Sequence, residues 1–105
     1  MTHINAENMN FAVLDRMVKS AESEVTIDNV LGQRYIAAGA SGKRVVINGI
    51  PGNALGAYMD GCVIEVHGNA QDAVGDTMNT GTLVVYGNCG DTAGYGMRGG
   101  KIFVK

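Results

Sequence analysis

The fold is decided by residues 45–105, which read VVINGIPGNALGAYMDGCVIEVHGNAQDAVGDTMNTGTLVVYGNCGDTAGYGMRGGKIFVK. Glycines recur in this stretch every nineteen residues, at Gly56, Gly75 and Gly94. Aliphatic residues share the interval in two columns, namely Val45, Ile64, Leu83 and Ile102, and Ile47, Val66, Val85 and Val104. The column between them is mixed: Val46, Glu65, Val84 and Phe103. Because successive side chains of a strand point to opposite faces, each repeat is predicted to hold one short strand with an apolar inner face.

A unit of this length is too short for a strand, a crossover helix and a second strand, and it contains no helical period. It is instead typical of one coil of a solenoid, in which each coil adds about 4.8 Å along the axis. The predicted fold class is an all-β solenoid, a single-stranded parallel β-helix with nineteen-residue coils. Crossovers between parallel strands favour the right-handed form. The recurring glycines are expected at turns that require φ > 0.

The first 23 residues are predicted to be a tail and a capping helix, and residues 24–105 the β-helix domain. Residues 1–5 are expected to be frayed, and Asn5 to cap a helix over residues 6–21 with Glu7 in its first turn. The apolar residues of that helix have an amphipathic period: Phe11, Leu14, Met17, Val18 and Ala21. Residues 24–29 are predicted to be a strand with Val25 and Ile27 on one face, and residues 32–42 an atypical starting coil.

The sequence stops at Lys105, on the last residue of a predicted strand. An open aliphatic edge of this kind favours association. The β-helix is therefore expected to be incomplete at its C-terminal end, either as part of a longer solenoid or as a homo-oligomer that pairs through the open end.

Charge and composition narrow the function classes. The net charge is −2, the pI is about 5.5, and the eight Lys and Arg residues are scattered, so neither nucleic acid nor an anionic membrane is an expected partner. The sequence has no apolar run of membrane-spanning length and no secretory signal. Cys62 and Cys89 lie outside any CxxC or metal-ligand spacing, which favours free thiols in a reducing, cytoplasmic compartment.

Four patterns suggest chemistry, and each has a structural interpretation that we favour. Residues 94–99 fit the dinucleotide fingerprint G-x-G-x-x-G, but a strand follows them instead of a helix, so they are predicted to form a coil corner. The column of Asn53, Asp72 and Asp91 is predicted to form turns in place of a carboxylate site. His3 and His67 have no ligand-forming neighbours in the sequence.

The fourth pattern is a methionine column, Met59, Met78 and Met97, which is expected to fill the core, with an adaptable docking surface as the minor alternative. We therefore expect no catalytic, cofactor-binding or metal-binding residues, and no cofactor.

Four segments resemble a known family: residues 52–56 (GNALG), 68–75 (GNAQDAVG), 87–94 (GNCGDTAG) and 97–104 (MRGGKIFV). They are similar to the GXGXG β-helix domain, which forms the C-terminal part of the glutamate synthase large (alpha) subunit and also occurs within the formylmethanofuran dehydrogenase complex. The similarity covers about residues 24–105, and the short length resembles the stand-alone glutamate synthase form.

What the resemblance implies is a scaffold. In glutamate synthase an amidotransferase domain carries an N-terminal nucleophilic Cys, and a synthase domain carries FMN and an iron–sulfur cluster. Here Met1 is not followed by Cys, and no Cys spacing suits a cluster, so no catalytic residue is carried over.

The resemblance thus predicts a non-catalytic structural or assembly domain or subunit of a glutamate synthase-like oxidoreductase, which makes glutamate from glutamine and 2-oxoglutarate. Its expected partners are the amidotransferase and FMN/iron–sulfur synthase domains or subunits. Two alternatives stay open: an independent binding module for a small anion or nucleotide, and the equivalent subunit of a formylmethanofuran dehydrogenase-type complex.

Overall fold

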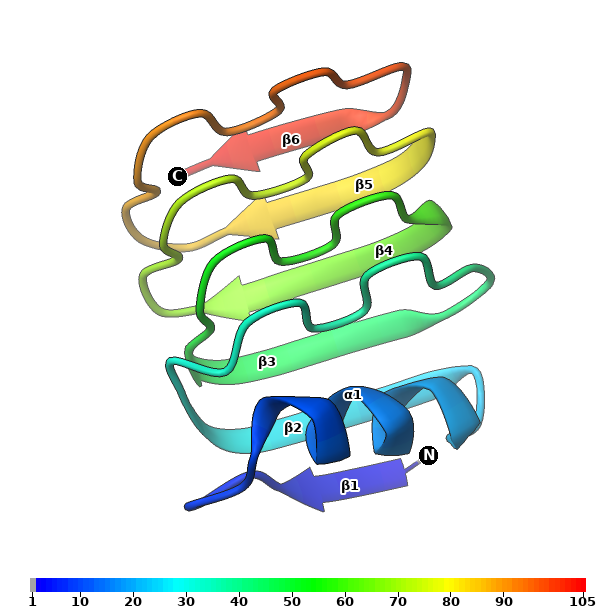
Figure 1. Ribbon diagram of the computed structural model, residues 1–105, viewed down its shortest axis with the longest axis vertical. Helices are drawn as coiled ribbons and strands as arrows, with labels where there is room; N and C mark the ends of the chain where they lie inside the picture. Colours follow the sequence, from blue (N-terminus) through cyan, green and yellow to red (C-terminus); the bar gives the residue numbers. More distant parts are fainter. Residues whose placement is uncertain (1) are drawn as a thin grey trace.

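The computed structural model describes residues 2–105 and has six parallel strands in one sheet, in the order β1-β2-β3-β4-β5-β6. The strands are β1 (Thr2–Asn5), β2 (Glu24–Leu31), β3 (Arg44–Ile50), β4 (Asp60–His67), β5 (Thr80–Val85) and β6 (Lys101–Val104), and the helix α1 is Phe11–Ser20. Figure 1 shows them stacked as a solenoid of about five turns, with the sheet on one side and turns on the other. The predicted β-solenoid is confirmed.

The strand register follows the aliphatic columns. Val45 is aligned with Ile64, Ile64 with Leu83, and Leu83 with Ile102, at the nineteen-residue interval. The first three of these side chains are fully buried, whereas Ile102 is half-buried. The second column behaves in the same way and ends at Val104, which is 52% exposed. Each coil thus buries the one before it, and within residues 2–105 nothing covers the last.

The N-terminal segment differs from the prediction. Residues 2–5 are the strand β1, in which Thr2 is aligned with Val25 of β2. The helix begins at Phe11, and its N-cap is Asn10, whose side chain accepts a 2.8 Å hydrogen bond from Ala12 N–H. The expected cap, Asn5, ends β1. The reason is that Asn8 adopts a φ of 58°, which interrupts any helix that starts before it.

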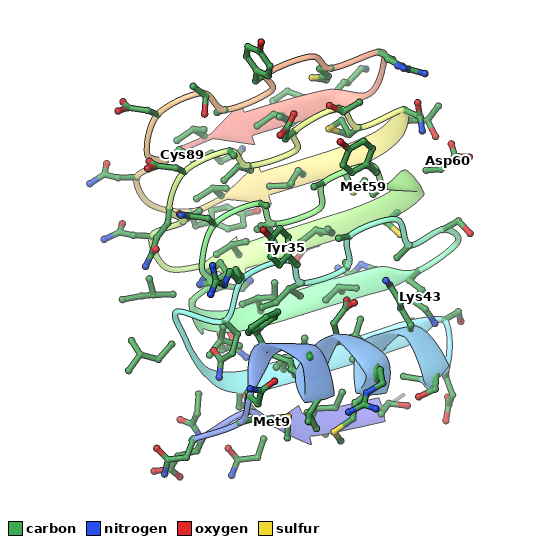
Figure 2. The ribbon with its side chains drawn as sticks, viewed as in Figure 1. Met9, Tyr35, Lys43, Met59, Asp60 and Cys89 are labelled. Atoms are coloured by element: carbon green, nitrogen blue, oxygen red, sulfur yellow. The ribbon has the colours of Figure 1, made fainter. Side chains whose placement is uncertain are left out.

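The amphipathic helix does close one end of the stack, as predicted. Leu14 and Val18 are buried in the core, and the Phe11 ring lies 6.0 Å from the ring of Tyr35 in the next coil. Lys43 Nζ donates a 2.8 Å hydrogen bond to the carbonyl oxygen of Ala21, and Figure 2 shows it beside the end of α1. The helix replaces the turns of the first coil.

A buried glutamine fixes the segment that leads into α1. Gln33 is 7% exposed, and its Nε2 donates to the carbonyl oxygens of Ala6 and Met9 at 3.0 and 3.1 Å. Its Oε1 accepts a 2.7 Å hydrogen bond from Leu31 N–H. One side chain therefore joins the first coil to the second. Among residues 2–105, no helix has the length and apolar character needed to cross a membrane.

Candidate functional site

The turn side of the solenoid carries the repeating glycines. In each coil, three residues at alternate positions adopt left-handed φ values: 35, 37 and 39; 54, 56 and 58; 73, 75 and 77; and 92, 94 and 96. Gly56, Gly75 and Gly94 have φ values of 67°, 66° and 73°, so the expectation that these glycines serve φ > 0 is confirmed. The same conformation at alanine, tyrosine and threonine positions was not visible in the sequence.

Hydrogen bonds between coils explain how alanine tolerates this conformation. Ala54 N–H donates to the carbonyl oxygen of Asp72, and Ala73 N–H to that of Asp91, each at 2.9 Å. In the reverse sense, Gly75 N–H donates to Leu55 in the preceding coil at 2.8 Å. A left-handed L-residue costs about 1–2 kcal/mol, and these bonds offset part of it because the backbone groups would otherwise lose water without a partner. The turn side is therefore a hydrogen-bonded ladder like the sheet.

The polar turn column adds a side-chain ladder. Asn53 Oδ1 accepts a hydrogen bond of 3.0 Å from Asp72 N–H, and Asp72 Oδ1 accepts one of 2.7 Å from Asp91 N–H. A second ladder runs from Asn69 Oδ1 to Asn88 N–H at 2.9 Å. The expectation that these residues serve turns is confirmed, with one correction. They bond to the backbone of the next coil and not to their own.

The G-x-G-x-x-G segment is a coil corner, as predicted. It is followed by β6 and not by a helix, and Gly94 and Gly96 have φ values of 73° and 64°. Gly94 N–H donates to the carbonyl oxygen of Val74 at 2.8 Å, and Arg98 N–H to that of Met78 at 2.9 Å. A phosphate cradle needs several free backbone N–H groups at a helix N-terminus. Here these amides already serve the neighbouring coil.

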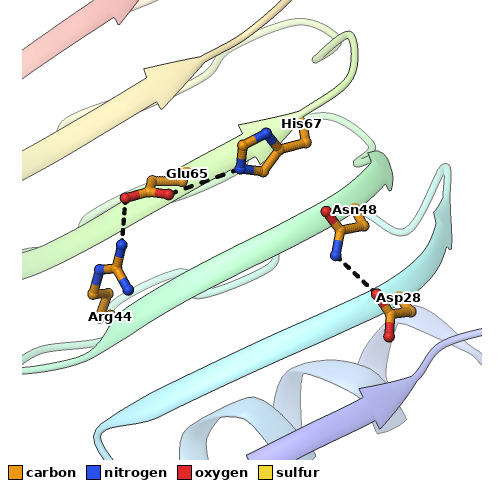
Figure 3. Close-up of polar contacts among 5 residues, drawn as sticks. All are labelled: Asp28, Arg44, Asn48, Glu65 and His67. Atoms are coloured by element: carbon orange, nitrogen blue, oxygen red, sulfur yellow. Dashed lines mark hydrogen bonds and ion pairs between the residues drawn. The ribbon is translucent and has the colours of Figure 1, made fainter.

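The outer face of the sheet carries a small polar cluster, drawn in Figure 3. Arg44 of β3 pairs with Glu65 of β4 at 2.6 Å, and Glu65 lies 3.8 Å from His67 Nε2 on the same strand. The His67 ring stacks on Tyr86 with centroids 5.0 Å apart. All of these side chains are at least partly exposed, so the ion pair contributes little to stability. The cluster is a solvated face of the sheet.

The remaining candidate residues are dispersed. Cys62 is buried in β4, whereas Cys89 is half-buried in the last coil (Figure 2), and burial raises the pKa of its thiol. His3 is exposed on β1. Met59 and Met78 are fully buried and Met97 is half-buried, so the core-filling interpretation of the methionines is confirmed. Within residues 2–105, no three His, Cys, Asp or Glu side chains lie close enough together to hold a metal ion.

The largest hollow lies at the C-terminal end of the stack, inside the last coil. Its volume is about 720 Å³, and the residues around it include Ala93, Gly94, Met97, Gly100 and Ile102. These are positions that the core fills in the preceding coils, where Val74, Met78 and Leu83 are fully buried. The hollow is thus an open end of the hydrophobic core.

These observations define a class of protein before any comparison is made. It is a parallel β-solenoid of left-handed turns, in which the repeating polar groups serve hydrogen bonds between coils and the open surface is an end of the core. The chain belongs to the GXGXG motif family, whose family model matches residues 4–105. The name describes the alternate left-handed positions of the turn side, which are both glycines at Gly94 and Gly96. No curated protein and no solved structure matches the chain significantly.

Proposed function

We propose that the chain is a structural and assembly domain of a glutamate synthase-like oxidoreductase and has no catalytic activity of its own. In this role it holds an amidotransferase unit and an FMN/iron–sulfur synthase unit in position while nitrogen from glutamine reaches 2-oxoglutarate. The supporting observation is the use of the repeat. Hydrogen bonds between coils occupy the backbone amides of the turn side and the side-chain oxygens of Asn53, Asn69 and Asp72.

This consumption of polar groups favours a scaffold over a binding module for small anions. At the glycine corner of the last coil, the N–H groups of Gly94, Met97 and Arg98 already have carbonyl partners at 2.8–3.0 Å. An anion would have to displace those bonds, and each displaced carbonyl would then lose its partner. A thermal-shift series with nucleotides, phosphate and dicarboxylates tests this alternative, and we expect no change in midpoint.

Reconstitution tests the proposal itself. The purified chain is mixed with the separately purified amidotransferase and FMN/iron–sulfur synthase proteins of the same organism, and two quantities are measured. These are co-elution on a sizing column and glutamine-dependent glutamate formation. We expect a stable complex and a higher rate than the two catalytic proteins reach without the chain. No complex and no change in rate would contradict the role.

A control separates assembly from a catalytic contribution. Substitution of polar side chains on the outer sheet face, as in Arg44→Ala or His67→Ala, leaves the core intact because both side chains are exposed. Such variants are expected to change the affinity of the complex and to leave the rate at saturating chain concentration unaltered. A loss of rate at saturation with affinity unchanged would contradict a scaffold.

A further inference from the structure

The two ends of the stack carry complementary surfaces. At the C-terminal end, β6 offers an unpaired outer edge of four residues, and at the N-terminal end β1 offers another of the same length. All six strands are parallel, so the two edges run in the same direction and differ only by translation along the axis. We propose that β6 of one copy pairs with β1 of a second copy, so that the chain assembles head to tail.

The inner columns fix the register of this contact. Within the chain, Thr2 and Ile4 of β1 are aligned with Val25 and Ile27, and Ile102 and Val104 complete the same two columns in β6. Continued into a second copy, Ile102 is aligned with the partner copy's Thr2 position and Val104 with its Ile4 position. Val104, which is 52% exposed, then becomes buried. Burial of such apolar surface favours association by about 25 cal/mol per Å².

The helix supplies the second half of the contact. Residues of a helix are 100° apart, which places Phe11 on one flank of the buried Leu14 and Met17 and Val13 on the other. Phe11 contacts Tyr35 in the coil above, so the opposite flank faces the N-terminal end of the stack. Val13 and Met17 are 39% and 40% exposed there. In a head-to-tail contact this apolar flank enters the hollow of about 720 Å³ in the last coil of the other copy.

Charge favours unlike ends over like ends. Arg98, Lys101 and Lys105 are exposed at the C-terminal end, and two such ends would bring these cations together. At the other end Glu24 lies in the same strand column as Lys101, and it is exposed. A two-fold contact between C-terminal ends would also leave both hollows empty. A heterologous contact of this kind does not close, so open stacks of increasing length are expected.

Two variants block one end each. Met17→Lys places a charge on the helix flank and leaves β6 free, whereas Val104→Lys places an inward-pointing charge on β6 and leaves β1 and α1 free. Both side chains are at least 40% exposed, so the fold tolerates the change. Val63→Lys, on the outer face of β4 and 38% exposed, is the matched control away from both ends. Circular dichroism verifies the fold, and Val13→Lys and Val104→Glu serve as a second pair.

Sedimentation equilibrium of the purified chain decides the matter. We expect the parent and Val63→Lys to exceed the single-chain mass of 11.0 kDa increasingly with concentration, and each end-blocked variant to stay at that mass. An equimolar mixture of Met17→Lys and Val104→Lys is expected to give twice that mass and nothing larger, because one free end of each kind remains.

Three results would overturn the proposal: a parent that stays monomeric at its highest soluble concentration, an end-blocked variant that dimerises alone, or a mixture that stays monomeric. Dimers of Met17→Lys alone would indicate contact between two C-terminal ends. Because these measurements use only the purified chain, their outcome is independent of the oxidoreductase role proposed above.

Discussion

The side-chain oxygen of Asp72 accepts a hydrogen bond of 2.7 Å from the backbone N–H of Asp91, nineteen residues further along the chain. The same atom type at Asn53 serves Asp72, so each side chain fixes the height of the coil above it. These ladders stand on the exposed edge of the turn side, where neighbouring coils are otherwise held by backbone hydrogen bonds alone.

Removal of one rung of this ladder is expected to lower stability modestly. Asp72→Ala deletes the acceptor and leaves Asp91 N–H to water, which should reduce the free energy of unfolding by about 1 kcal/mol. Asp72→Asn keeps an acceptor of the same geometry, as Asn53 already does one coil below, and should stay within about 0.5 kcal/mol of the parent. Urea denaturation at constant pH measures both, and equal midpoints for the two variants would contradict a role for this hydrogen bond.

A second prediction concerns the glycines at the strand ends. A Cβ on Gly68 would collide with the carbonyl oxygen of Gly49, so Gly68→Ala forces two coils apart. We expect a loss of about 3 kcal/mol or more, measured by urea denaturation. Gly42→Ala is the matched control, because its φ of 65° is also positive but the space around it is open. It should cost only about 1 kcal/mol for the backbone conformation. Equal losses would mean that close coil contact is not the cause.

The third prediction tests the junction between the helix and the solenoid. Gln33→Leu removes partners from the N–H of Leu31 and from two carbonyl oxygens, and should cost about 3 kcal/mol because these groups are largely buried. Hydrogen exchange should show reduced protection in residues 11–20. Gln71→Leu changes an exposed glutamine in the same way and should have almost no effect. Unaltered protection of the helix in Gln33→Leu would contradict this role.

The fourth prediction concerns the two thiols. Burial raises the pKa of the Cys89 thiol, so at neutral pH a smaller fraction is thiolate than in a free peptide. Cys89 should therefore react with iodoacetamide more slowly than glutathione does, and its rate should continue to rise to higher pH. Cys62 is fully buried and should react only after unfolding. Mass spectrometry after timed alkylation distinguishes the two, and preferential labelling of Cys62 in the folded protein would contradict the arrangement.

The nineteen-residue interval was sufficient to predict the strands β3 to β6, their register and the inward columns that begin at Val45 and Ile47. It could do so because burial is recorded in side-chain type, and a stacked coil repeats the same burial at each step. The glycine corner at residues 94–99 was predicted for the same reason, since its glycines recur at equivalent positions of earlier coils.

The first coil was predicted less well because α1 replaces the turns there and the interval no longer applies. The strand Thr2–Asn5 was missed, and the helix was started at residue 6 when it begins at Phe11. A short polar segment such as this one becomes a strand only because β2 lies beside it. The left-handed conformation of Ala54 and Ala73 was equally invisible, since alanine does not require it.

The sequence by itself therefore determined that this protein is a solenoid, how long its coil is, and which side chains form its interior. The tertiary structure alone decided where the backbone and Asx hydrogen bonds go, how the helix meets the second coil, and which surfaces remain at the two ends. The physical reason is that burial depends on each residue's own chemistry. A hydrogen bond or an end surface depends on the group that stands beside it, one coil away.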